Sequence, residues 1–89
     1  MTQDQPTTGL PLVIDARGLN CPLPVLRLRK RLKQVAAGTA IELLATDRAA
    51  LRDVPAFCTA QGHVLVKVAD ENGTLRFQVF KASARLPDI

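Results

Sequence analysis

The chain has no tryptophan and no tyrosine, and its aromatic residues are limited to three phenylalanines. It also lacks a Gly-x-x-Gly loop, so its composition argues against an RNA-binding surface that stacks bases on aromatic rings. No apolar run approaches the roughly 20 residues that a membrane-spanning helix needs. The opening residues, MTQDQPTTGL, lack the basic and apolar regions of a signal peptide. We therefore expect a cytoplasmic protein that has no contact with a membrane.

Cysteine and histidine are scarce, and their positions exclude several kinds of chemistry. Cys21 and Cys58 lie too far apart in the chain for a Cys-x-x-Cys redox pair. A structural zinc site needs four ligands, whereas the two cysteines and His63 supply only three, without the usual close spacing. His63 is the only candidate base for a cysteine hydrolase, and a lone histidine at a strand start is more often structural. We expect reduced thiols, because disulfides are rare in the cytoplasm, and neither metal nor cofactor.

Acidic residues are absent from one long stretch, although the chain as a whole carries 12 Lys and Arg against 8 Asp and Glu. Between Ala16 and Ile41 there are six cations and no acid, so the positive charge is local. Such a patch increases the rate of encounter with acidic proteins and with nucleic acid alike, so it does not indicate which of them is the partner. The alternative interpretation is that these cations are only the solvated side of an amphipathic helix. We expect a surface that docks acidic proteins, made of Arg17, Arg27, Lys30, Arg31 and Lys33.

The 89 residues, 47% of them hydrophobic, suit one small domain. We predict flexible tails at residues 1–9 and 83–89 around a domain spanning residues 10–82. Apolar runs predict strands over residues 12–14 and 40–45, and helical periodicity predicts a helix over residues 22–37 that Gly38 ends.

A second helix is expected between a Thr46-Asp47 cap and Gly62, in two pieces, with Asp53 capping the piece that contains Pro55. Alternating residues on either side of Asn72-Gly73 predict a β-hairpin. The order strand, helix, strand, helix, strand, strand predicts an α/β two-layer sandwich, βαβαββ, with two helices on one face of a four-stranded mixed sheet.

The segment Gly18-Leu19-Asn20-Cys21-Pro22-Leu23-Pro24 carries the strongest chemical signal, because it joins a glycine turn directly to the basic helix. We place Cys21 at the helix N-cap and Pro22 at the first helical position, where its missing N–H costs nothing. Pro24 removes another donor, so only the Leu23 amide remains for a Cys21 thiolate. The helix dipole and nearby cations favour that thiolate, which predicts a Cys21 pKa below the free value of about 8.5.

Sulfur transfer through a persulfide suits a single thiol with no base, metal or resolving cysteine. A Cys21 thiolate attacks the outer sulfur of a donor persulfide, takes it as Cys-S-SH and passes it on by the same exchange. A buried, inert thiol is the alternative for Cys21 and the expectation for Cys58, which lies in an apolar helical stretch. A small basic RNA-binding module and a thiol sensor whose Cys21 becomes oxidised are the remaining alternatives.

The run Asp15-Ala16-Arg17-Gly18-Leu19-Asn20-Cys21-Pro22-Leu23-Pro24 resembles the Cys-Pro-x-Pro region of the TusA (SirA-like) family of small sulfur carriers. The resemblance extends from about Leu12 to Lys81. It implies the same βαβαββ sandwich and a sulfurtransferase that carries its persulfide on Cys21, with no small-molecule active site of its own. Further matches follow in Arg29-Lys30, Thr46-Asp47, Asp53-Val54-Pro55-x-Phe57-Cys58, Gly62-His63 and Phe77-x-Val79-x-Lys81.

The resemblance also implies partners. Family members accept sulfur from a cysteine desulfurase or a rhodanese-like protein and deliver it to a downstream carrier, and the best-known route ends in 2-thiouridine of tRNA. We expect that role here, with sulfur oxidation, molybdenum-cofactor or selenium pathways as alternatives. Arg48 stands where the family often has proline, and we expect little effect from this difference. Leu23 stands where members of the tRNA pathway often have an acid, and this difference leaves the delivery partner open. We expect a monomer that forms no stable complex with nucleic acid.

Overall fold

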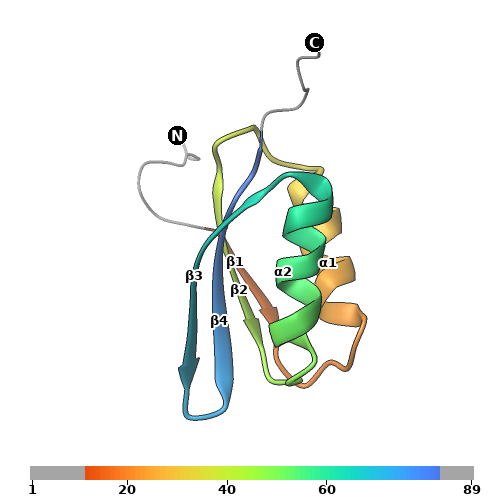
Figure 1. Ribbon diagram of the computed structural model, residues 1–89, viewed down its shortest axis with the longest axis vertical. Coiled ribbons are helices and arrows are strands. Elements are labelled where there is room, and N and C mark those ends of the chain that lie inside the picture. Colours follow the sequence, from red (N-terminus) through yellow and green to blue (C-terminus); the bar gives the residue numbers. More distant parts are fainter. Residues whose placement is uncertain (1–11, 83–89) are drawn as a thin grey trace, which may run out of the picture.

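The computed structural model describes residues 12–82, so the tails expected at residues 1–9 and 83–89 lie outside the described range. Both helices lie on one side of a four-stranded mixed sheet, which confirms the predicted two-layer α/β sandwich (Figure 1). Its elements in chain order are β1 (Leu12–Ala16), α1 (Leu23–Leu32), β2 (Ala40–Ala45), α2 (Ala50–Gln61), β3 (Val64–Glu71) and β4 (Thr74–Phe80).

The strand order in the sheet is β1-β2-β4-β3. β1 and β2 are parallel, whereas β4 is antiparallel to both of its neighbours. Parallel strands need a crossover connection, and α1 supplies it between β1 and β2. α2 makes the next crossover, from β2 to β3. Both helices therefore begin at the edge of the sheet where β1 and β2 end (Figure 1).

The hydrophobic core fills the space between the sheet and the two helices. Alternate residues of β4, Leu75, Phe77 and Val79, are fully buried, as period-2 strand geometry requires. Leu28 of α1 and Val54 of α2 pack against them from the helical layer. Within residues 12–82, neither helix has the length and apolar character needed to cross a membrane.

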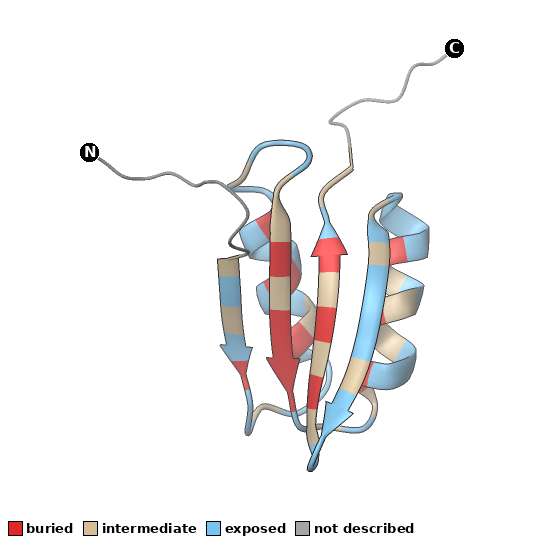
Figure 2. Cartoon of the chain, turned by 90° about the vertical axis from the view of Figure 1, so that its left-hand side faces the viewer, coloured by how far each residue is buried: buried red, intermediate tan, exposed pale blue. Residues whose placement is uncertain are grey.

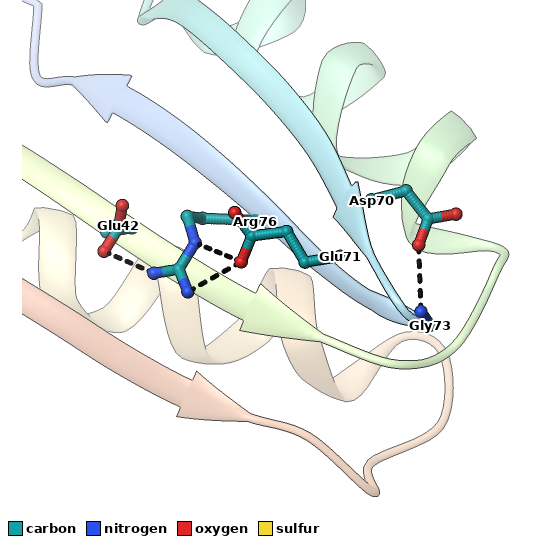
Figure 3. Close-up of polar contacts among 5 residues, drawn as sticks. All are labelled: Glu42, Asp70, Glu71, Gly73 and Arg76. Atoms are coloured by element: carbon teal, nitrogen blue, oxygen red, sulfur yellow. Dashed lines mark hydrogen bonds and ion pairs between the residues drawn. The ribbon is translucent and has the colours of Figure 1, made fainter.

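The opposite face of the sheet has no helix of the described residues over it (Figure 2). Arg76 of β4 bridges this face, because its guanidinium lies 2.9 Å from Glu42 of β2 and 3.0 Å from Glu71 of β3 (Figure 3). The predicted hairpin turn is confirmed: Asn72 and Gly73 both have positive φ, as a type I′ turn requires, and Gly73 donates its N–H to Asp70.

α1 ends at Leu32 and not near residue 37, so the predicted end is wrong. The chain leaves the helix through a tight turn in which Gln34 donates its N–H to the Arg31 carbonyl. The end of β4 holds the following loop in place, because Lys81 donates its Nζ to the Val35 carbonyl and its N–H to the Thr39 carbonyl. These contacts come from a strand that is distant in the sequence.

α2 is one continuous helix with Pro55 in its interior, so the prediction of two pieces with Asp53 as a cap is wrong. Ala50, Val54 and Cys58 are spaced four apart and are all buried, so packing of one stripe against the sheet maintains the helix across the proline. Gly62 ends α2 in the left-handed conformation, as predicted.

Leu28 and Leu26 of α1 give a matched test of this packing. Leu28 is fully buried, whereas Leu26 is 47% exposed. We expect Leu28→Ala to lower the free energy of unfolding by about 2–5 kcal/mol, because it leaves a cavity, and Leu26→Ala to change it by less than about 1 kcal/mol. Urea denaturation followed by circular dichroism measures both. Equal losses for the two variants would contradict the described orientation of α1.

Candidate functional site

Cys21 lies in the loop between β1 and α1, at the edge of the sheet where both helices begin. The loop between β2 and α2 lies beside it, and two hydrogen bonds join the loops. Gly18 donates its N–H to Thr46 Oγ1 at 2.9 Å, and Cys21 donates its N–H to Asp47 Oδ2 at 2.6 Å. The parallel pairing of β1 and β2 therefore brings Cys21 against the start of α2.

The turn that presents Cys21 depends on Gly18. Its φ of +82° belongs to the left-handed region, which a residue with a side chain rarely adopts. The turn closes when Leu19 donates its N–H to the Ala16 carbonyl at 3.2 Å, and Leu19 packs against the core. Cys21 follows at an exposed position of this anchored loop.

The start of α1 differs by one residue from the predicted start. Pro22 occupies the N-cap, joined to Cys21 by a cis peptide bond, so Cys21 precedes the cap and Pro24 is at the second helical position. The Leu23 amide donates to the Asn20 carbonyl at 2.8 Å and not to the Cys21 sulfur. The predicted cap hydrogen bond to a Cys21 thiolate is therefore wrong, because a local turn uses that donor.

The Cys21 thiol has a different partner. Its Sγ donates to Asp53 Oδ2 at 2.8 Å. Asp53 lies in the first turn of α2, and its other oxygen, Oδ1, accepts from Arg52 Nε at 3.1 Å. In the sequence analysis Asp53 is an expected helix cap and part of a match to the family, with no role beside the thiol. Nothing in the local pattern indicated that it lies beside Cys21, since the two residues belong to different crossovers.

This contact overturns the predicted acidity of the thiol. The hydrogen bond to Asp53 raises the pKa of Cys21, desolvation raises it further, and the negative charges of Asp53 and Asp47 add to the effect. Arg52 is the cation that opposes them. The same hydrogen bond, followed by that from Arg52, lowers the pKa of the Asp53 carboxyl. The prediction of a lowered Cys21 pKa is wrong, because two carboxylates lie near the sulfur instead of the predicted cations.

The expected docking cations have different surroundings. Arg17 pairs with Asp15 at 2.8 Å in the β1–α1 loop and lowers the pKa of that carboxyl to about 2. Three of the other expected docking cations line a groove of about 620 Å³ between α1 and β1. Lys33 lines a second groove of about 400 Å³ near the end of α2. The three in the first groove, which pair with no acid of residues 12–82, are Arg27, Lys30 and Arg31.

Cys58 and His63 lie away from the Cys21 site. Cys58 is buried in the core, as predicted, and burial raises its pKa. His63 follows the end of α2, whereas Cys21 lies near the start of that helix. The Nδ1 atom of His63 accepts the Ala82 N–H at 3.0 Å. Desolvation and the charge of Lys81 lower the His63 pKa. Over residues 12–82, no cluster of His, Cys, Asp or Glu side chains is arranged to hold a metal ion.

The hydrogen bond between Cys21 and Asp53 has a measurable signature. In Cys21→Ala we expect the pKa of Asp53 to rise toward 3.8, as followed by NMR titration of its carboxyl carbon. Asp47 is the internal control, because the substitution keeps the backbone amides of Ala49 and Cys21 that lower its pKa. An unchanged Asp53 midpoint would contradict the contact.

The same bond contributes to stability within a defined pH window. The pKa of Asp53 is lowered in the folded state, so its contribution is present above the unfolded value of about 3.9 and is lost as the pH falls through the folded value. The pKa of Cys21 is raised, so the contribution is complete below the unfolded value of about 8.5 and is lost as the pH rises through the folded value.

Comparison with known proteins finds both a family and individual relatives. The family described as "Sulfurtransferase TusA" matches residues 12–81. The protein named "Sulfur carrier protein TusA" of Pseudomonas aeruginosa strain PAO1 is 39% identical over 75 residues, which cover 84% of this chain and 95% of that protein. The protein of the same name from Pseudomonas entomophila is 43% identical over 68 residues, covering 76% of this chain and 85% of that protein.

The fold has a solved counterpart in a SirA-like protein from Desulfitobacterium hafniense. The TM-score is 0.72 at 23% identity, covering 81% of this chain and 99% of that chain. This likeness concerns the fold, and the sequence matches to the family cover most of the chain. The protein therefore belongs to the TusA family of sulfur carrier proteins.

Proposed function

We propose that this protein is a cytoplasmic sulfurtransferase that carries sulfane sulfur as a persulfide on Cys21. The donor is a cysteine desulfurase or a rhodanese-like protein, and the acceptor is a downstream carrier protein. The observation that carries the proposal is the contrast between the two cysteines of the sequence: Cys21 is exposed on an anchored loop, whereas Cys58 is buried in the core. Only Cys21 offers its sulfur to another protein.

The exchange balances without an oxidant or a cofactor. Cys21 Sγ bonds to the outer sulfur of the donor persulfide, the S–S bond of the donor breaks, and its electron pair goes to the donor cysteine sulfur. The Cys21 thiol gives up a proton and that leaving sulfur takes one up. Delivery repeats the same steps, with an acceptor thiol as the attacking group.

The surroundings of Cys21 support a protein-bound substrate. The Cys21 thiol is exposed to solvent in the loop between β1 and α1. A protein partner that brings its own persulfide suits such a position better than a free small molecule, which needs an enclosing pocket.

The end use that we propose is synthesis of 2-thiouridine in tRNA, on the strength of the family resemblance. Sulfur oxidation, molybdenum-cofactor and selenium pathways are the alternatives. Leu23, which is 46% exposed and lies two residues after Cys21, makes this surface apolar where members of the tRNA pathway often have an acid. The acceptor surface that meets the thiol is therefore expected to be apolar at that point.

Intact-mass measurement tests sulfur acceptance. After incubation with a cysteine desulfurase, pyridoxal phosphate and cysteine, we expect a reducible gain of one sulfur, about 32 Da, on the wild-type protein. Cys21→Ser should lose the gain, and Cys58→Ser is the matched control that should keep it. A rhodanese with thiosulfate is the second donor, and no gain from either donor would contradict the proposal.

The groove beside β1 is the surface that we propose to dock acidic partners. Arg27 and Arg31 line it without an ion pair to any described acid, while Asp15, which lines the same groove, is paired with Arg17. Arg27→Glu with Arg31→Glu should therefore slow sulfur acceptance by about tenfold at low salt and by less at high salt. Arg29→Glu with Lys67→Glu makes the same change of net charge outside this groove and is the control. Unchanged acceptance rates in the first double variant would contradict docking at this groove.

A further inference from the structure

The charges that face the Cys21 sulfur are mainly negative. Asp53 of α2 accepts the thiol hydrogen at 2.8 Å, and Asp47, in the loop before α2, accepts the backbone N–H of the same cysteine at 2.6 Å. Arg52 is the cation that acts on the thiol, and it is already bonded to Asp53 Oδ1. Arg17, from the loop of Cys21 itself, is paired with Asp15. The starts of both helices add the partial positive charge of their dipoles.

This arrangement conflicts with what sulfur exchange requires. The attacking species is the thiolate and not the thiol. Ionisation of Cys21 would remove the proton that joins Sγ to Asp53 Oδ2 and would leave two negative charges at hydrogen-bond distance. In the free protein the carboxylate therefore holds the sulfur in its protonated, weakly nucleophilic form.

We propose that Asp53 is a positioning residue that holds the Cys21 thiol protonated in the free carrier, and that a cationic group of the sulfur donor, placed against Asp53 and Asp47, releases the thiolate on docking. The proposal rests on the proposed function of Cys21. The exposed Cys21 thiol loses its proton to solvent on docking, the leaving sulfur of the donor takes up a proton from solvent after the exchange, and Asp53 stays a carboxylate throughout.

Charge complementarity indicates the chemistry of the partner. Asp53 Oδ2 has the thiol as its only hydrogen-bond donor among residues 12–82, so a lysine or arginine of the donor can replace the thiol there. The partner surface should then carry both positive and negative charges. A cation of the partner should face Asp53, and its acidic residues should face the groove lined by Arg27, Lys30 and Arg31. An unloaded carrier would also resist alkylation and oxidation, which act on the thiolate.

Exchange with small disulfides tests the charge requirement on the full chain without a donor protein. The probes are cystamine, which is cationic, 2-hydroxyethyl disulfide, which is neutral, and dithiodiglycolate, which is anionic. Mass mapping of peptides scores modification of Cys21 separately from Cys58. At low salt we expect the wild-type protein to react several-fold faster with cystamine than with the neutral probe, and slowest with dithiodiglycolate.

The Asp53→Asn variant should reduce this preference for the cationic probe. It should also increase the rate of alkylation by neutral iodoacetamide at pH 7 about 3- to 10-fold, because more of the thiol is ionised. The midpoint of its pH–rate profile should fall, and Asp53→Glu, which restores the charge, should return it toward that of the wild type. Glu71→Gln is the matched control, since it removes one negative charge that does not act on the Cys21 pKa.

Two results would overturn the proposal. One is a wild-type Cys21 that reacts fastest with the anionic probe, as a site dominated by the basic helix would. The other is an Asp53→Asn variant with the wild-type pH midpoint and probe preference. Neither readout involves a persulfide, so these outcomes are independent of the mass measurement that tests sulfur acceptance.

Discussion

β1 and β2 run parallel and end side by side, with Ala16 paired to Ala45 at the last position of the register. Parallel neighbours force the chain to cross over through α1, and the same sense of crossing then starts α2 at the same edge. Two loops that are distant in the sequence meet there, joined by the hydrogen bonds from Gly18 to Thr46 and from Cys21 to Asp47. The position of the thiol, its carboxylate neighbours and its exposure all depend on this pairing.

The charges of the protein are divided between two neighbouring regions. Asp47 and Asp53 lie at the start of α2, beside the thiol. Arg27, Lys30 and Arg31 of α1, which pair with no acid of residues 12–82, lie in the groove beside β1. A carrier must meet its donor, receive sulfur and leave again. Cations that attract an acidic partner increase the rate of encounter, and carboxylates that suppress the free thiolate limit reaction with anything else. Under the proposed function, the two regions serve different steps of one transfer.

Most of the fold could be predicted from local patterns. The order of elements, the Asn72-Gly73 turn and the end of α2 at Gly62 depend on residue spacing and on glycine conformation, which neighbours in sequence determine. The end of α1 could not be predicted, because Lys81 holds the following loop from the far end of the chain. The continuity of α2 across Pro55 likewise depends on burial against the sheet, which outweighs the local effect of a missing amide.

By itself the sequence determined which cysteine is the candidate for the chemistry: one cysteine lies in a glycine turn before a basic helix, and the other lies inside an apolar helical stretch. The tertiary structure decided which charges surround the Cys21 sulfur. Acidity depends on charges within a few ångströms, and the carboxylate that lies 2.8 Å from the sulfur comes from a second crossover. No local pattern around Cys21 encodes Asp53, because strand pairing and not sequence proximity brings them together.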